Sequence, residues 1–169
     1  MPRQVRPIRI CGDVAYVTLT QGYEAIIDAA DVPLFEPWSW FAVPTGGTVY
    51  AVRSDYSGTN MRTVYAHRTI LGEPYGLDVD HKDGDGLNNR RENLRPATKS
   101  QNMRNRRINL NSTSGFKGVY FHRQAGKWAA QIKIRGKAKY LGLFASPEKA
   151  HSAYCTASRE LHGEFGRTS

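Results

Sequence analysis

Four polar residues in the middle of the chain have types and spacings that could work together chemically. Asp80 and His81 are adjacent, Asn93 follows the histidine by twelve positions, and Asn102 comes nine positions later. Carboxylate and amide oxygens are hard ligands, which suit Mg²⁺ or Mn²⁺ better than zinc. A neutral histidine beside such an ion can take a proton from water near physiological pH. A base and one metal ion are sufficient to hydrolyse a phosphodiester.

The surrounding sequence predicts the elements that must position these side chains. We expect one strand over residues 77–81, a turn at the Asp-Gly-Asp-Gly of residues 83–86, and a second strand that begins after Asn93. Thr98 and Gln101 have the spacing of a capping box, which predicts the start of a helix. Strand, turn, strand and helix in this order would bring the helix, with its asparagine, back beside the first strand.

The stretch from Asp78 to Arg95, with the sequence DVDHKDGDGLNNRRENLR, resembles the HNH endonuclease family, and Thr98 and Ser100-Gln101-Asn102 extend the match. The subgroup that it resembles is typical of phage and intron-encoded homing endonucleases. The resemblance implies a ββα-metal fold. It further implies these roles: His81 as general base, Asp80 and Asn102 as metal ligands, and Asn93 as the residue that braces the loop and orients the base.

A calcium-binding loop is an alternative interpretation of this stretch. It would use Asp78, Asp80, Asp83 and Asp85, but Lys82 occupies the third ligand position and no glutamate stands at the closing position. We therefore interpret the acids beyond Asp80 as turn formers. Arginines close to the stretch could each clamp a phosphate near the metal, or could be ordinary surface residues. These are Arg68 and Arg104.

Positive charge is concentrated in one part of the chain. The protein carries a formal net charge of +9, but residues 90–145 hold 14 Lys and Arg against the single acid Glu92, whereas residues 1–89 hold 7 against 11. A basic surface of this density suits a polyanion, because each neutralised phosphate releases counterions. Together with the candidate site, it predicts double-stranded DNA as the partner.

The last part of the chain predicts three strands, over residues 118–122, 128–135 and 139–144, and a helix from Pro147 to about His162. Residues 115–166 resemble the APETALA2-type DNA-binding domain, whose three-stranded sheet lies in the DNA major groove. Alternation in the second strand assigns Gln131 to the DNA face and Ile132 to the helix face. The positions carried over as DNA contacts, with Arg135 added from the same strand face, are Lys117, Tyr120, His122, Gln131, Lys133, Arg135 and Tyr140.

The predicted fold class is α+β, in three parts. Residues 1–66 form a β-rich segment, residues 67–108 the HNH core, and residues 109–169 a linker with the APETALA2-like domain. In the first part, Trp38 and Trp40 are expected on one face of a strand, with core packing as their commoner use.

We expect a soluble, cytoplasmic protein without a small-molecule cofactor or a membrane association. Neither a long apolar run nor a signal-peptide pattern is present in the sequence, and the two cysteines, Cys11 and Cys155, form no metal or disulfide pattern. The predicted activity is that of a site-directed DNA endonuclease of the homing type. As a monomer it would nick one strand, whereas a homodimer could cut both. The alternatives are a DNA-binding regulator without catalysis and a nuclease directed at RNA.

Overall fold

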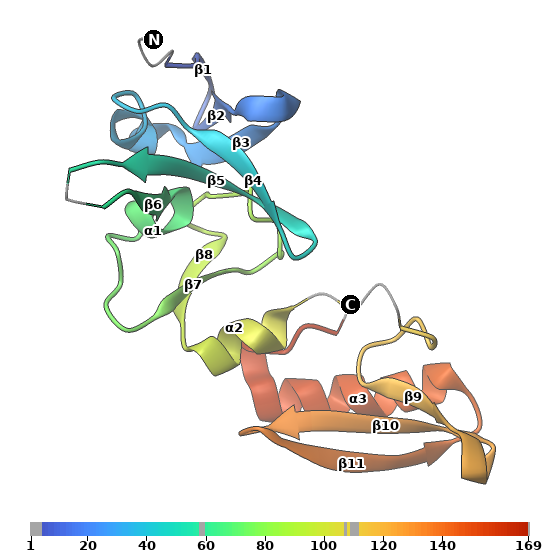
Figure 1. Cartoon of the computed structure of the whole chain (residues 1–169). Helices are drawn as coiled ribbons and strands as arrows, with labels where there is room; N and C mark the ends of the chain where they lie inside the picture. The colour runs from blue at the N-terminus through green and yellow to red at the C-terminus, as the bar shows by residue number, and fades with distance from the viewer. Residues whose placement is uncertain (1–4, 58–59, 107, 109–111, 169) are drawn as a thin grey trace. The chain divides into compact units, whose positions relative to one another are not determined.

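The computed structural model describes residues 5–57, 60–106, 108 and 112–168. The chain divides into two compact units, Met1–Thr98 and Lys99–Ser169. Both units combine small antiparallel sheets with helices (Figure 1), an architecture compatible with the predicted α+β class. The three-part division with boundaries after residues 66 and 108 stays a prediction. None of the helices in the described ranges has the length and apolar character needed to cross a membrane.

Two three-stranded sheets form most of the first unit. Alternation builds them: in the VAYVT strand Ala15 and Val17 are buried, and in the EAIID strand Ala25 and Ile27 are buried. These side chains face the core and their neighbours face outward. One sheet has the order β1-β2-β3 and the other β4-β5-β6. The bounds are β1 Ile8–Cys11, β2 Val14–Thr18, β3 Glu24–Asp28, β4 Phe41–Thr45, β5 Thr48–Asp55 and β6 Arg62–Tyr65, with short 3₁₀ turns η1 Thr20–Gly22 and η2 Ala29–Leu34.

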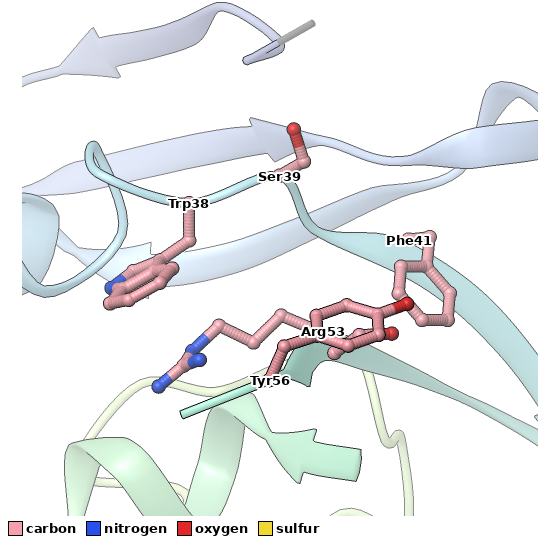
Figure 2. Close-up of a pocket in the computed structure, with 6 residues that line it drawn as sticks. Trp38, Ser39, Phe41, Arg53 and Tyr56 are labelled. Carbon is pink, nitrogen blue, oxygen red and sulfur yellow. The ribbon is translucent and has the colours of Figure 1, made fainter. Parts of the chain in front are cut away.

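The prediction that Trp38 and Trp40 share one face of a strand is wrong. Strand β4 begins only at Phe41, and the two tryptophans lie in the connection before it. Trp40 is buried, stacks near Phe35 and donates its indole N–H to the Phe35 carbonyl. Trp38 is 38% exposed, and its ring covers the Arg53 guanidinium at 4.0 Å, beside a pocket of about 140 Å³ (Figure 2). The expected core role therefore holds for one tryptophan, and the other packs on a cation.

A short helix and a two-stranded hairpin complete the first unit. Helix α1 (Ala66–Ile70) follows β6 directly, and β7 (Asp78–His81) pairs antiparallel with β8 (Leu94–Ala97). Val79 and Leu94 from the hairpin belong to the same buried cluster as the side chains of the first sheet. The hairpin is thus packed on the core that the N-terminal strands supply.

The second unit holds α2 (Lys99–Asn105), a sheet of order β11-β10-β9 and the long helix α3 (Pro147–His162). Figure 1 shows α3 running along one face of this sheet. Ile132 of β10 packs with Tyr154 and Ala157 of α3, so the Ile132 side of the strand faces the helix, as predicted. The remaining bounds are β9 Val119–His122, η3 Arg123–Ala125, β10 Lys127–Ile134, β11 Lys137–Phe144 and η4 Gly163–Phe165.

Two details of the second unit differ from the sequence prediction. The helix that starts at the capping box is predicted to run through Arg106 and Arg107, whereas α2 ends at Asn105, where the Lys117 ammonium donates to the Arg104 and Arg106 carbonyls. Arg107 and residues 109–111 of the predicted linker lie outside the described residues. Strand β10 ends at Ile134, and Arg135 lies in the hairpin turn with φ 47°. Alternation therefore does not extend to Arg135.

Candidate active site

The β7–β8 hairpin buries two of the predicted site residues next to each other. Asp80 is 4% exposed and His81 is 5% exposed, and in the ladder they stand opposite Arg95 and Leu94. Successive residues of a strand point to opposite faces, so the carboxylate and the imidazole leave the hairpin on different sides. Burial of two such polar groups in a four-residue strand requires partners for both.

Arg95 is the partner of Asp80. Its Nε and Nη2 atoms lie 2.9 Å and 2.8 Å from the same carboxylate oxygen, Oδ2. The two side chains come from directly opposed positions of the hairpin, so strand pairing itself brings them together. The ion pair holds the carboxylate in one orientation and balances its charge inside the protein.

His81 is held in a polar contact with Asn89. The imidazole Nε2 lies 3.2 Å from the Asn89 side-chain oxygen. Burial lowers the pKa of His81 below its ordinary 6.5, although the Asn89 contact and the nearby carboxylates act in the opposite direction. The ring is therefore neutral at physiological pH, which is the state that can accept a proton.

A second buried histidine packs against the first. The ring of His67, on α1, meets the His81 ring edge-on at 5.0 Å between centroids, and Tyr50 of β5 contacts both rings. Burial lowers the pKa of His67 to about 3, with the charges of His81 and Arg68 as smaller causes. No partner lies within hydrogen-bond distance of His67 Nδ1 among the described residues. These three rings form one face of the site.

Asn93 ties the loop between β7 and β8 together. Its oxygen accepts the Asp83 backbone N–H at 3.1 Å, and its amide group donates to the Asp83 carboxylate at 2.9 Å and to the Asn88 carbonyl at 2.7 Å. Asp83 and Asp85 also accept backbone N–H groups two residues on, at 2.8 and 3.0 Å, which confirms both as turn formers. Burial acts to raise the pKa of Asp83, but these hydrogen bonds outweigh it and lower the pKa.

The same loop is anchored on the N-terminal strands. Ile26 of β3 donates its N–H to the Leu87 carbonyl at 2.8 Å and accepts the Asn89 N–H at 2.7 Å. Arg91 makes a two-nitrogen contact with the buried carboxylate of Asp31, with the shortest distance 2.6 Å. Arg91 also donates its backbone N–H to Asp28. The β-rich segment of residues 1–66 therefore supports the loop that carries the site.

Comparison with known families agrees with this geometry. The family model of the HNH endonuclease matches residues 64–104, which include α1, the hairpin and all of α2 except its last residue, Asn105. The protein carries an HNH endonuclease domain. This family membership indicates a nuclease that acts on DNA.

Two viral proteins are similar to the chain. Protein 3.8 of Escherichia phage T7 is 34% identical over 94 residues, which cover 56% of this chain and 77% of the phage protein, so the two belong to one family. The uncharacterized HNH endonuclease L560 of Acanthamoeba polyphaga mimivirus is 29% identical over 160 residues, 92% of this chain and 81% of its own. No solved structure matched the chain.

The two arginines that were expected near a phosphate, Arg68 and Arg104, lie in different units. Arg68 donates to Glu73 and to the Leu77 and Pro74 carbonyls, at 3.0, 2.9 and 3.1 Å, and so holds the turn before β7. Arg104 lies on α2 in the second unit, as does Asn102. Phosphate contacts by the two arginines, and metal binding by Asn102, stay predictions.

Five of the seven predicted DNA contacts in the second unit lie on one face of the sheet. The exceptions are Lys117 and Arg135. Ladder pairing places Tyr120 opposite Ala129, His122 opposite Lys127, and Gln131 opposite Tyr140, so these side chains share the face turned away from α3. Lys133 is exposed on the same face. Lys117 instead caps the end of α2, because its ammonium donates to the Arg104 and Arg106 carbonyls at 2.6 and 2.7 Å. Burial lowers the pKa of Lys117 to about 8.

Sequence reasoning missed two residues of the site. Asn89 was included only as a member of the family stretch from Asp78 to Arg95, and His67 was given no role. A turn asparagine becomes buried only when another part of the chain covers it, and no local pattern predicts that. Position 89 is covered by strand β3, more than sixty residues earlier in the sequence.

Proposed function

We propose that the protein is a metal-dependent DNA endonuclease of the homing type, with His81 as its general base. The observation that carries the proposal is the environment of this residue: a buried, neutral imidazole that directly follows, in the sequence, a carboxylate oriented by Arg95, and that adjoins a loop braced by Asn93. A neutral imidazole can accept the proton of an attacking water, which supports acid–base hydrolysis of a phosphodiester. The hairpin and α2 would together form the ββα-metal unit that the family resemblance implies.

The donor set suits a hard divalent cation. Asp80 supplies a carboxylate whose orientation Arg95 holds through a single oxygen, Oδ2. Among the described residues, no group of three or more His, Cys, Asp or Glu side chains is arranged so that it could hold a metal ion by itself. The family resemblance implies that the Asp80 carboxylate and the Asn102 amide oxygen would hold this ion, Mg²⁺ or Mn²⁺. When bound, the ion supplies charge neutralisation at the scissile phosphate and the departing oxygen.

The residues of the chain then have separate roles in cleavage and DNA binding. His81 takes the proton from the attacking water, and Asn93 keeps the loop around it in shape. The exposed sheet face of the second unit, with Gln131, Lys133 and Tyr140, holds DNA in the manner of the APETALA2-type domain that it resembles. Each chain contributes one such site, so a monomer nicks one strand, and a double-strand cut needs a homodimer or a second binding event.

The test is nicking of supercoiled DNA with Mg²⁺ by the full chain, its His81→Ala variant and its Asp80→Asn variant. We expect both variants to bind DNA like the original chain while the cleavage rate falls by about 10²–10⁴-fold, the usual contribution of a general base. Asp13→Asn, in the exposed β1–β2 turn, is the matched control and should cleave normally.

If all variants bind DNA equally and the original chain leaves it intact, the protein is a DNA-binding regulator instead. If only an RNA substrate is cut, the DNA assignment is wrong. Omission of Mg²⁺ should abolish cleavage, and undiminished cleavage in a chelator would contradict the metal assignment.

A further inference from the structure

The buried amide of Asn89 is in direct contact with the candidate base. Asn89 is 0% exposed, and its Oδ1 lies 3.2 Å from His81 Nε2. It stands eight positions after the histidine, in the loop that joins β7 to β8. Its role in chemistry depends on which of the two atoms, the oxygen or the nitrogen of the amide, faces the imidazole.

The loop decides the orientation of this amide. Its Nδ2 lies 3.1 Å from the Leu87 carbonyl oxygen and 3.5 Å from the Gly86 carbonyl oxygen. Both of these atoms can only accept hydrogen bonds. A flipped amide would place its own oxygen against two carbonyl oxygens and leave its N–H groups toward the histidine, so the network requires Oδ1 to face His81.

We infer that Asn89 is a positioning residue that fixes neutral His81 in the tautomer with the proton on Nε2. An amide oxygen has no hydrogen to give, so the 3.2 Å contact is a hydrogen bond only if the imidazole donates it. Nδ1 then carries the lone pair and is the nitrogen that takes the proton from water. The catalytic part of this inference rests on the proposed function, whereas the tautomer itself does not.

The backbone around Asn89 makes the contact rigid. Its N–H donates to the Ile26 carbonyl at 2.7 Å, and the preceding loop carbonyl of Leu87 accepts from Ile26. Gly86, three residues earlier, donates to the Thr48 hydroxyl at 3.2 Å. Strands β3 and β5 therefore both hold the loop, and the Asn89 amide connects this support to the candidate base.

The experiment measures the tautomer directly in the full chain labelled with ¹⁵N-histidine. Long-range ¹H–¹⁵N spectra at about pH 8, where an ordinary imidazole is neutral, distinguish a protonated ring nitrogen from an unprotonated one. We expect His81 to show a protonated Nε2 and an unprotonated Nδ1. In Asn89→Leu, which has a similar volume but no acceptor, this pattern should give way to a mixture of the two tautomers.

Asn88→Ala is the matched control within the same loop. It removes the 2.8 Å bond from Asn88 to Asp83 but leaves the contact to His81 in place. Both variants should loosen the loop, yet only Asn89→Leu should change the tautomer. In nicking assays Asn89→Leu should lower kcat by at least about tenfold with KM within about twofold, since a misplaced proton affects the base and not DNA binding.

The outcomes separate the two proposals. A protonated Nδ1 in the original chain, or an unchanged tautomer in Asn89→Leu, overturns the inference. If Asn89→Leu does not fold, the spectrum of the original chain still decides. The expected tautomer in a chain that cleaves no DNA would retain Asn89 as the residue that sets it and would refute the proposed function.

Discussion

At the scale of single residues, the neutral buried histidines predict a loss of stability in acid. The pKa of His67 is about 3 in the folded protein and 6.5 as its ordinary value. Below pH 6.5 the unfolded chain binds a proton that the folded chain does not, so the free energy of unfolding falls as the pH falls. His67 alone should contribute about 1.4 kcal/mol per pH unit between pH 6 and 4, and His81 acts in the same direction.

The measurement is urea unfolding at several pH values for the original chain and His67→Phe, which keeps an aromatic ring at this position. The variant should show a clearly shallower decline between pH 6 and 4. Parallel curves for the two proteins would mean that His67 does take up a proton in the folded state.

The candidate site itself could be predicted in part because its key residues are local in sequence. Asp80, His81 and Asn93 lie within fourteen positions, and their types restrict the chemistry. The partner of the carboxylate, Arg95, was not predicted, since its role follows from the register of the hairpin. Asn89 and His67 join the site only through contacts with distant strands, which a local pattern does not contain.

At the scale of elements, the loop of the hairpin depends on an ion pair with the N-terminal segment. Asp31 is 3% exposed, while the side chain of its partner Arg91 is 53% exposed. Arg91→Met leaves a buried carboxylate without its cation, which we expect to lower the free energy of unfolding by about 2 kcal/mol, less than for a fully buried pair because solvent screens the arginine. Nicking activity should fall as well, since the loop carries the site.

Chemical denaturation of two further variants checks this reasoning. Arg62→Met breaks an ion pair of an arginine that is 68% exposed, and should cost less than about 1 kcal/mol. The double variant Arg91→Met with Asp31→Leu should regain most of the lost stability, because it removes the buried charge. Equal effects of Arg91→Met and Arg62→Met would show that the loop does not rely on Asp31.

Single strands and helices could be predicted from the sequence better than the contacts between them. Hydrophobic alternation indicated the strands of both units, and the pattern of small residues indicated α3. The prediction of a strand around Trp38 was wrong. Two tryptophans separated by one residue have the spacing of strand alternation, but Trp38 packs on the Arg53 guanidinium. The parallel contact of Ile26 with the loop near Asn88 joins segments more than sixty residues apart, and sequence periodicity says nothing about such a pairing.

At the scale of the whole molecule, the two units differ in charge. Residues 1–98 contain 10 Lys and Arg against 12 Asp and Glu, whereas residues 99–169 contain 14 against 3. The acidic unit holds His81, the proposed general base, and the basic unit holds α2 and the exposed sheet face. Because the ammonium of Lys117 closes the end of α2, deleting residues 109–169 would also disturb α2. Substitutions therefore test DNA binding more cleanly than truncation does.

The salt dependence of DNA affinity should show that the contacts to DNA phosphates lie on the second unit. If Lys133 contacts a phosphate, Lys133→Gln should reduce the slope of log K against log salt by about 0.9, since one counterion fewer is released. Gln131→Ala, on the same face, should leave the slope unchanged and alter the preference among sequences. Arg9→Gln, an exposed residue of the acidic unit that pairs with Glu24, is the control for the loss of one positive charge. A fall in slope for Arg9→Gln equal to that for Lys133→Gln would contradict this division, because both units would then contact the DNA backbone.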